Sequence, residues 1–298
     1  MLGERIAEKM PALSPGQQSI AKYILGNPRD AAFLTAFQLG EIVGVSESTV
    51  IRFAAVLGYS GYPEMRSAVR EILMERLSTL ERLREYDEPG GAHYFFRAID
   101  EDIKTLSAAQ ASLDTRALEE LGSMVAAADQ VLVAGQRSSR ALAYYLWYYL
   151  SWLFPNIHLL DPDSAIEKVI NASPKSLVIG ISFPRYTSWT VEVMRHSHMC
   201  GIPTASITND YSSPLATWSN IVIPVPWNPI SFIDSFTAPI SIMNCVILGA
   251  ARVLGSAVQQ RLEILERTWG ENEVYVNRLP KLETAGMKDP GKSQGHFK

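Results

Sequence analysis

The feature that most constrains the fold of this chain is a change of pattern near residue 130. Before it, apolar residues recur at the three- to four-residue spacing of helices, and no convincing strand pattern occurs in residues 1–88. Continuous apolar strands separated by helices form parallel sheets that are covered on both faces. The sequence therefore predicts an all-α domain followed by an α/β doubly wound domain with a five-stranded parallel sheet. The expected strands are Val131–Ala134, Ile157–Leu160, Leu177–Ser182, Thr204–Thr208 and Ile221–Val225.

Breaks in these patterns predict where the domains begin and end. The segment Pro89-Gly90-Gly91 follows the first helices and has the composition of a linker. From Arg278 onward the sequence is polar and contains Pro and Gly, which is typical of disorder. One long helix is predicted for residues 236–268. The expected boundaries are a helical domain over 1–88, a linker helix over 89–112, an α/β domain over 113–275 and a disordered tail over 276–298.

Charge and composition narrow the class of protein. The 298 residues have a net charge of -4, which excludes a uniformly basic nucleic-acid coat protein but allows a reader of specific DNA sequences. Residues 141–160 and 235–251 carry no charge but are interrupted by Pro and Asn, so we predict buried helices and no membrane partner. The early acidic residues argue against a signal peptide, and we expect a cytoplasmic protein.

The two cysteines, Cys200 and Cys245, lie far apart among apolar neighbours. Isolated cysteines in such a setting are usually buried thiols, and they suit a reducing compartment. No Cys or His spacing indicates a zinc site. We therefore expect neither a metal nor another cofactor.

The clearest local signal is a pair of short helices within residues 35–54. Gly44 permits a tight turn between them, Ser46 caps the second helix and Gly58 ends it. Helices joined in this way form a helix-turn-helix, whose second helix enters the major groove of DNA. The apolar residues expected to face the core of this unit are Leu39, Ile42, Val43, Val50, Ile51 and Phe53.

The polar start of the second helix carries the candidate DNA-binding residues. Hydroxyl groups suit phosphates or base edges, and arginine suits guanine or phosphate. The alternative is an ordinary helical hairpin with a solvated face, because residues 40–70 hold three Arg and three Glu and hence no basic footprint. The candidates are Ser46, Glu47, Ser48, Thr49 and Arg52.

Two loops of the α/β domain have the composition of an anion site. Each follows a buried strand and places hydroxyl groups and an arginine at the start of a helix, over residues 134–140 and 181–188. Hydroxyls together with the N–H groups of a helix N-terminus bind a phosphate monoester without a metal. Ser or Thr before a helix is more often only a cap, so each loop alone is a weak signal. The candidate effector-binding residues are Gly135, Arg137, Ser138, Ser139, Ser182, Arg185 and Thr187.

Residues 2–76 resemble the N-terminal domain of the RpiR family of transcriptional regulators. The matching runs are Leu13 to Gln18 (LSPGQQ), the helix-turn-helix, and Leu57 to Arg66 (LGYSGYPEMR). Gly40 stands where the family pattern usually has Ala. The resemblance implies that this domain binds operator DNA through its second helix.

Residues 115–265 resemble the SIS domain, which binds phosphosugars in both isomerases and regulators. The pattern of the first loop, GxGxS, matches at Gly135, Arg137 replaces the second Gly, and the serines Ser138 and Ser139 follow. The pattern of the second loop, SxSGxT, matches at Ser182 and Thr187, whereas Pro184 and Arg185 replace the second Ser and the Gly. The resemblance implies a small-molecule effector, either a phosphosugar or a sugar acid whose carboxylate an arginine can hold.

The resulting hypothesis is a regulator whose operator affinity depends on this effector, and it has two rivals. One is a phosphosugar isomerase with an accessory helical domain, and the other is a module that binds protein in place of DNA. An isomerase needs a general base. None of the candidate bases lies in a recognisable catalytic motif, so we predict no enzyme activity; they are Glu167, Glu192, His158, His196 and His198.

Aromatic residues surround the predicted helix at residues 138–153. A helix that is apolar on all sides is buried on all sides, so one side can pack on the sheet and the others need a further partner. We expect a homodimer or homotetramer, in which two recognition helices read a palindrome. The aromatic residues are Tyr144, Tyr145, Trp147, Tyr148, Tyr149, Trp152 and Phe154.

Overall fold

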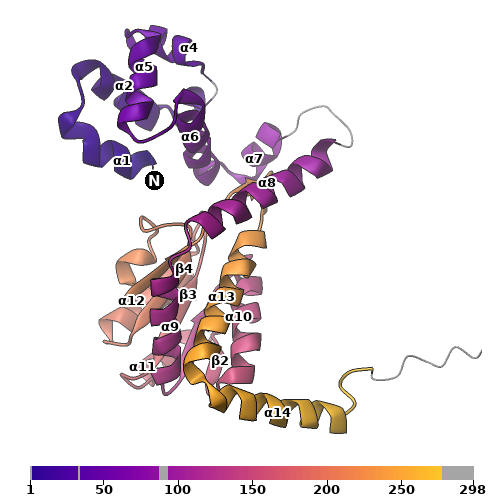
Figure 1. Cartoon of the computed structure of the whole chain (residues 1–298). Coiled ribbons are helices and arrows are strands. Elements are labelled where there is room, and N and C mark those ends of the chain that lie inside the picture. Colours follow the sequence, from indigo (N-terminus) through magenta and orange to yellow (C-terminus); the bar gives the residue numbers. More distant parts are fainter. Residues whose placement is uncertain (1, 33, 87–92, 277–298) are drawn as a thin grey trace, which may run out of the picture.

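The computed structural model describes residues 2–32, 34–86 and 93–276, and Figure 1 shows a helical head above an α/β body. The predicted linker Pro89-Gly90-Gly91 and nearly all of the predicted tail lie outside the described residues. Within the head, no described residue is in a strand. Its helices are α1 (Leu2–Lys9), α2 (Pro15–Gly26), α3 (Pro28–Ala31), α4 (Ala36–Val43), α5 (Glu47–Val56) and α6 (Tyr62–Arg76), with a short 3-10 helix η1 (Met10–Ala12).

The core of the head confirms part of the predicted apolar face. Leu39, Val50 and Phe53 are completely buried. The prediction was wrong for Ile42 and Ile51, which are 52% and 45% exposed. Ile51 follows Val50 directly, and successive helical residues point about 100° apart, so both cannot face the same core. Ile42 lies in the last turn of α4 and is rotated by about 60° from the buried Leu39, beyond the edge of the core-facing side.

The sheet confirms the predicted doubly wound architecture. Its five strands are parallel and have the order β2-β1-β3-β4-β5. The predicted strands all form, with bounds that differ by at most one residue. They are β1 (Val131–Ala134), β2 (Ile157–Leu159), β3 (Leu177–Ile181), β4 (Thr204–Thr208) and β5 (Ile221–Pro224).

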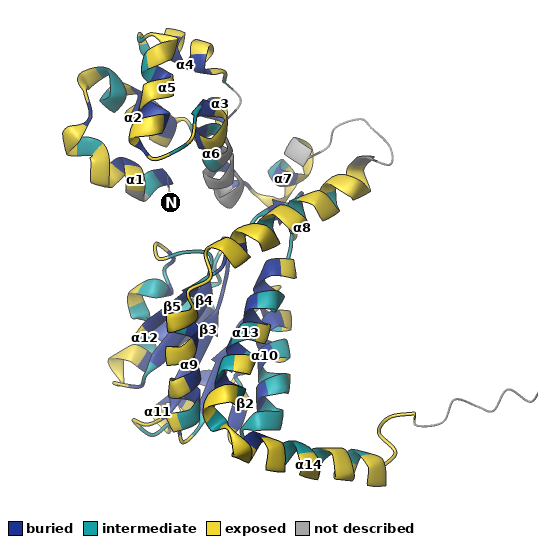
Figure 2. Cartoon of the chain, viewed as in Figure 1, coloured by how far each residue is buried: buried dark blue, intermediate teal, exposed yellow. Residues whose placement is uncertain are grey.

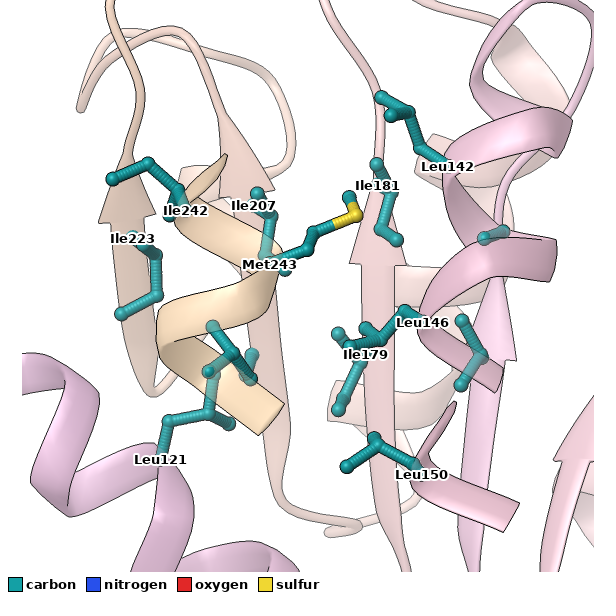
Figure 3. Packing of buried hydrophobic residues seen from close by; sticks show 14 of the residues in the cluster. Leu121, Leu142, Leu146, Leu150, Ile179, Ile181, Ile207, Ile223, Ile242 and Met243 are labelled. Atoms are coloured by element: carbon teal, nitrogen blue, oxygen red, sulfur yellow. The ribbon is translucent and has the colours of Figure 1, made fainter. Parts of the chain in front are cut away.

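Helices cover both faces of this sheet because alternate strand residues point to opposite sides. Val131 and Val133 join one apolar cluster, and Leu132 and Ala134 join the other. Figure 3 shows leucines of α10 facing the isoleucines of β3 in the first cluster. Helices α9 (Thr115–Ala127), α10 (Ser139–Leu153) and α13 (Thr237–Leu254) cover that face, and α11 (Ala165–Ile170) and α12 (Ser188–Met199) cover the opposite one.

Two further helices connect the head to the body. They are α7 (Thr79–Tyr86) and α8 (His93–Ala111), and Figure 1 places both between the head and the sheet. Ser78 and Glu81 form a capping box at the start of α7: the Ser78 N–H donates to Glu81 Oε2 at 2.9 Å, and the Glu81 N–H donates to Ser78 Oγ at 3.3 Å. The sequence therefore fixes where α7 begins.

The predicted helix over residues 236–268 is in fact two helices. Helix α13 ends at Leu254 and α14 (Ser256–Glu271) begins two residues later. Gly255 between them has φ 58°, a left-handed conformation that glycine adopts without strain. A short antiparallel hairpin that was not predicted, β6 (Pro229–Ile230) and β7 (Ile233–Asp234), precedes α13, and a 3-10 helix η2 (Ala216–Trp218) precedes β5.

Among the described helices, α13 is the one that is long and apolar enough to cross a membrane by length and composition. Core helices of globular proteins meet the same criterion. Buried side chains of α13, among them Ile242 and Met243, belong to the cluster that covers the sheet, as Figure 3 shows. This packing supports the prediction of a core helix.

Two predictions of burial need correction. Cys200 is exposed because it caps the C-terminus of α12, and Cys245 is half-buried. In α10, leucines pack on the sheet, but Tyr144 and Tyr148 are 53% and 37% exposed. Figure 2 shows that buried and less buried residues alternate along this helix. The helix is therefore buried on one side and presents an aromatic surface on another.

Candidate functional site

The turn of the helix-turn-helix is held by a close approach of two backbones. Gly44 ends α4 with φ 76°, and the Val45 N–H donates to the carbonyl oxygen of Gly40 at 2.9 Å. A Cβ on Gly40 would lie 2.7 Å from the Val45 carbonyl oxygen. Gly40 was noted in the sequence only as a departure from the family pattern, and the structure shows that it lets the turn lie directly on α4.

The N-terminus of α5 is capped by its own hydroxyl groups. Ser46 Oγ accepts from the Thr49 N–H at 3.3 Å and lies 2.9 Å from the hydroxyls of Ser48 and Thr49. Arg52 folds back along the helix, with Nε donating to the Ser48 carbonyl oxygen at 3.2 Å. Of the candidates, Thr49 is partly buried and the other four are exposed.

One exposed residue of α5 was missed by sequence reasoning. Ile51 lies beside Arg52 and three residues after Ser48, so it shares the solvent-facing surface of the recognition helix. An exposed aliphatic side chain on such a surface can contact the methyl group of thymine. Because Ile51 is apolar, the sequence predicted that it faces the core. The structure shows that the neighbouring Val50 faces the core, so Ile51 does not.

In the body, the two candidate loops lie where the order of the strands reverses. The chain leaves β1 toward β2 on one side and returns to β3 on the other, so the carboxyl ends of β1 and β3 flank a switch point. Ligands of doubly wound sheets bind at such a point. The sheet therefore brings residues 135–139 and 182–187 to the same edge.

The first loop is tightly packed around its glycine. A Cβ on Gly135 would lie 2.8 Å from the Ser139 carbonyl oxygen and 2.9 Å from Ala143 Cβ, so no larger residue fits there. Ser138 is exposed and donates from Oγ to Asp234 Oδ2 at 3.0 Å. Ser139 is buried at the first position of α10. Among the described residues, the exposed side chain of Arg137 has neither a hydrogen bond nor an ion pair.

The second loop presents a buried hydroxyl and an exposed arginine. Ser182 is 2% exposed, and Phe183 after it is also buried. Arg185 is exposed, and its Nη1 donates to the Thr79 hydroxyl at the start of α7. Thr187 Oγ1 lies 2.8 Å from Thr190 Oγ1, so its hydroxyl contributes to the first turn of α12.

Both arginines that replace glycines of the SIS pattern have left-handed backbones. The φ angles are 55° at Arg137 and 70° at Arg185. This region disfavours residues with a Cβ, and each such residue costs about 1–2 kcal/mol. Each loop therefore presents a cationic side chain from a strained backbone position, which increases the positive charge available to an anion.

Two charged residues at this edge were not predicted. Asp234, at the end of β7, accepts from Ser138 and also lies 3.3 Å from Arg82 Nη1, with Oδ1 as the facing atom. Arg82 belongs to α7 and is 1% exposed. No sequence signal joins these residues, because 152 positions separate them. The two residues meet because α7 packs on the body.

The candidate catalytic bases do not gather at the loops. Glu192 pairs with Arg195 at 2.7 Å, and the hydrogen bond from Arg195 holds the pKa of the Glu192 carboxyl below its ordinary value. His158 Nε2 lies 2.8 Å from Asn156 Oδ1. Within residues 2–32, 34–86 and 93–276, no group of three metal-ligating side chains occurs. The loops therefore provide hydrogen-bonding hydroxyl groups and positively charged arginines.

An apolar groove elsewhere on the body does not suit an anion. It is lined by residues of α13 and α14, including Leu262, and by the acidic side chains of Glu263 and Glu266. Figure 1 places α14 at the end of the body remote from α7. The groove is therefore separate from the loops.

Comparisons with known proteins match both parts of the chain. The model of the helix-turn-helix domain of the rpiR family matches residues 1–76, and the SIS domain model matches residues 124–249. An uncharacterised HTH-type transcriptional regulator of Caldanaerobacter subterraneus is 27% identical over 223 residues, which are 72% of this chain and 77% of that protein.

Solved structures share the fold. The sugar isomerase domain of an RpiR transcription factor from Sphaerobacter thermophilus aligns with a TM-score of 0.55 and 24% identity, over 58% of this chain and 97% of that one. The NanR protein of Vibrio vulnificus, in complex with ManNAc-6P, aligns with a TM-score of 0.52 and 20% identity, over 90% of this chain and 99% of that one. The second alignment spans both the head and the body.

Proposed function

Because this chain belongs to the RpiR family of transcriptional regulators, we propose that it binds operator DNA through α5 and that an anionic sugar ligand at the SIS loops sets its operator affinity. The DNA contacts are assigned to Ser46, Glu47, Ser48, Thr49 and Arg52. Ile51 joins them as an apolar contact. The Arg52 side chain would contact a base or a phosphate once its hydrogen bond to the Ser48 carbonyl oxygen is broken.

The observation that carries the ligand site is the cationic character of the two loops at the switch point. Arg137 and Arg185 stand where the family pattern has glycine, and both have positive φ angles, so an arginine at each position carries a conformational cost. Serine hydroxyls and the N-termini of α10 and α12 lie in the same loops. The remaining members of the set are Gly135, Ser138, Ser139, Ser182 and Thr187.

These groups favour a ligand with more than one negative charge. A phosphate suits the hydroxyls and helix N-termini, and a carboxylate suits an arginine, which can bind it through two parallel hydrogen bonds. The complex of NanR with ManNAc-6P supports a phosphorylated sugar as the class. We propose a phosphosugar or a phosphorylated sugar acid.

We further propose a homodimer or homotetramer in the cytoplasm. The exposed aromatic surface of α10 offers a contact between copies, and Tyr148 and Trp152 there pack edge to face with their ring centroids 5.3 Å apart. A two-fold dimer reads a palindromic operator with two copies of α5, which increases specificity beyond that of one short helix. Ligand binding would act by changing how the two heads are held.

Sensing is proposed here in place of catalysis. Among the described residues, none of the five candidate bases hydrogen-bonds to Ser138, Ser182 or Arg185. The carboxylate that does contact the first loop, Asp234, is paired with Arg82. The regulators among the relatives support the same choice. An assay for isomerisation of glucose 6-phosphate tests it, and turnover by the purified protein would contradict the proposal.

The experiment that tests DNA binding is a selection from a random DNA library with the purified chain. The wild type should enrich a palindrome, and Arg52→Ala should lose it because the variant lacks the guanidinium that contacts a base or phosphate. Lys9→Ala is the matched control, because it removes a cationic side chain on α1 away from α5. Enrichment that survives in Arg52→Ala would remove α5 as the reading helix.

A further inference from the structure

An arginine from outside the α/β fold is buried beside the ligand loops. Arg82 lies on α7, and its guanidinium carbon is 5.3 Å from the centre of the Trp227 ring. Its Nη1 faces the Asp234 carboxylate at 3.3 Å. A cation that is 1% exposed needs an anionic partner, because burial of an unpaired charge is costly. Asp234 supplies an anionic partner of this kind.

The Asp234 carboxylate lies between this cation and a ligand-binding hydroxyl. One of its oxygens faces Arg82, and the other accepts from Ser138 Oγ at 3.0 Å. A phosphate or carboxylate group of a ligand is bound by the same kinds of group: a hydroxyl at the start of a helix and a guanidinium. Asp234 therefore occupies the position of an anion.

The second loop contacts the same helix. Arg185 donates to the hydroxyl of Thr79, one turn before Arg82 on α7. Both loops are thus linked to α7, the first through Asp234 and the second directly. The donors that an anionic ligand would use are held by the helix that follows the head.

We propose that Arg82 is a binding residue of the anion site, contributed by α7, and that a ligand's anionic group takes the place of the Asp234 carboxylate. This inference rests on the ligand site proposed above. The Arg82–Asp234 distance of 3.3 Å is longer than the roughly 2.7–2.9 Å of a strong charge-assisted hydrogen bond. A phosphate, which has more charge and more acceptor oxygens, competes well for such a partner.

Displacement of Asp234 would change the contacts of both helices between the body and the head, α7 and α8. The hairpin that carries Asp234 continues into Ser235 and Thr237, and both hydroxyls donate to the Asp102 carboxylate on α8; the Thr237 bond is 2.9 Å. Movement of the hairpin therefore changes contacts with α8, and the transfer of Arg82 to the ligand changes contacts with α7. Ligand binding and head position are coupled through these contacts.

The test measures how inorganic phosphate stabilises the full chain against thermal unfolding, with chloride at matched ionic strength as the reference. A ligand that binds the folded state raises the unfolding midpoint, and the rise grows with the logarithm of the ratio of ligand concentration to dissociation constant. Asp234→Asn keeps the shape of the side chain but removes the competing charge, so its apparent phosphate affinity should exceed that of the wild type by about tenfold. Arg82→Gln should lose the phosphate response.

Two controls make the result specific. Arg195→Gln removes an arginine from an exposed ion pair with Glu192 on α12 and should respond as the wild type does. The double variant Arg82→Gln with Asp234→Asn removes both charges, so it avoids an unpaired buried charge and should fold even if Arg82→Gln does not. It should show no phosphate response.

A response of Arg82→Gln or of the double variant equal to that of the wild type would overturn the proposal. So would the absence of a phosphate effect in Asp234→Asn. The library selection with Arg52→Ala reports on DNA binding separately. Failure there with a normal phosphate response would reject the regulator function but keep Arg82 as an anion-binding residue.

Discussion

Arg137 and Arg185 show at the scale of single residues how the ligand loops differ from their family pattern. Sequence reasoning identified the substitutions but not their conformation. The structure shows that each arginine has a positive φ. A residue with a Cβ has a higher conformational free energy at positive φ than a glycine has. An arginine at such a position is therefore a candidate for a functional role. Each arginine therefore has an effect on folding that is separate from its effect on binding.

Arg185→Gly should therefore weaken ligand binding without weakening the fold. Glycine relieves the strain of the left-handed backbone but gains entropy in the unfolded chain, and these effects nearly cancel, leaving the free energy of unfolding within about 1 kcal/mol of the wild type. Calorimetric titration with 6-phosphogluconate should show an affinity lower by about tenfold. Unchanged affinity would mean that Arg185 serves only its contact with Thr79.

Gly40→Ala should destabilise the head, because its Cβ would meet the Val45 carbonyl oxygen at 2.7 Å. Overpacking costs roughly 1–3 kcal/mol, against a gain of about 1 kcal/mol in helix propensity. Thermal unfolding followed by circular dichroism measures the difference. Gly3→Ala in α1 is the matched control, because a Cβ there meets nothing within 4 Å and should stabilise. Equal stabilisation by both substitutions would show that the turn adapts freely.

At the scale of whole elements, α7 is the helix whose stability matters most to the proposed coupling. Hydrogen bonds from the side chain and then the backbone of Ser78 hold the pKa of the Glu81 carboxyl below its ordinary value. A lowered pKa in the folded state means that the cap contributes fully above the ordinary pKa of a glutamate. The contribution is lost as the pH falls through the lowered value.

Hydrogen exchange of the α7 amides, corrected for intrinsic rates, should therefore show protection that is constant near neutral pH and falls in the acidic range below the ordinary pKa of Glu81. Glu81→Gln should have the weaker protection already at neutral pH, because its uncharged amide is a poorer acceptor for the two donors of Ser78. A variant with the protection and pH dependence of the wild type would show that the capping box does not hold α7.

The aromatic surface of α10 leads to a prediction about assembly. Tyr144 and Tyr148 are exposed and stack on each other with their ring centroids 6.2 Å apart. Tyr148→Glu should shift the chain toward monomers in sedimentation velocity, because a charge in an apolar contact must be desolvated. Ile170→Glu is the control, since this residue is 61% exposed on α11, which covers the other face of the sheet. An unchanged assembly in Tyr148→Glu would place the interface elsewhere.

At the scale of the whole molecule, the sequence predicts the sheet well and the connection between head and body poorly. Buried parallel strands leave short runs rich in apolar and β-branched residues, so all five strands were found. The hairpin of β6 and β7 has strands of two residues each and leaves no such run. Gly255 looked like one more residue of a long helix because periodicity does not report φ.

The pair Arg82–Asp234 was beyond sequence reasoning for a related reason. Each residue belongs to a segment whose local pattern is ordinary: Arg82 looks like the solvated face of a helix, and Asp234 lies beside an apolar stretch. Their contact depends on how α7 packs on the body, which is a property of tertiary structure. The candidate loops, by contrast, could be found because each follows a buried strand directly.

The central claim is that operator DNA and an anionic sugar ligand bind to one coupled molecule. The measurement that tests it is the dissociation constant for the selected operator with and without 6-phosphogluconate, at fixed salt, together with that of the ligand with and without operator. Coupling predicts that both constants change by the same factor, typically about 5- to 150-fold. A ligand that binds but leaves operator affinity unchanged would contradict the claim.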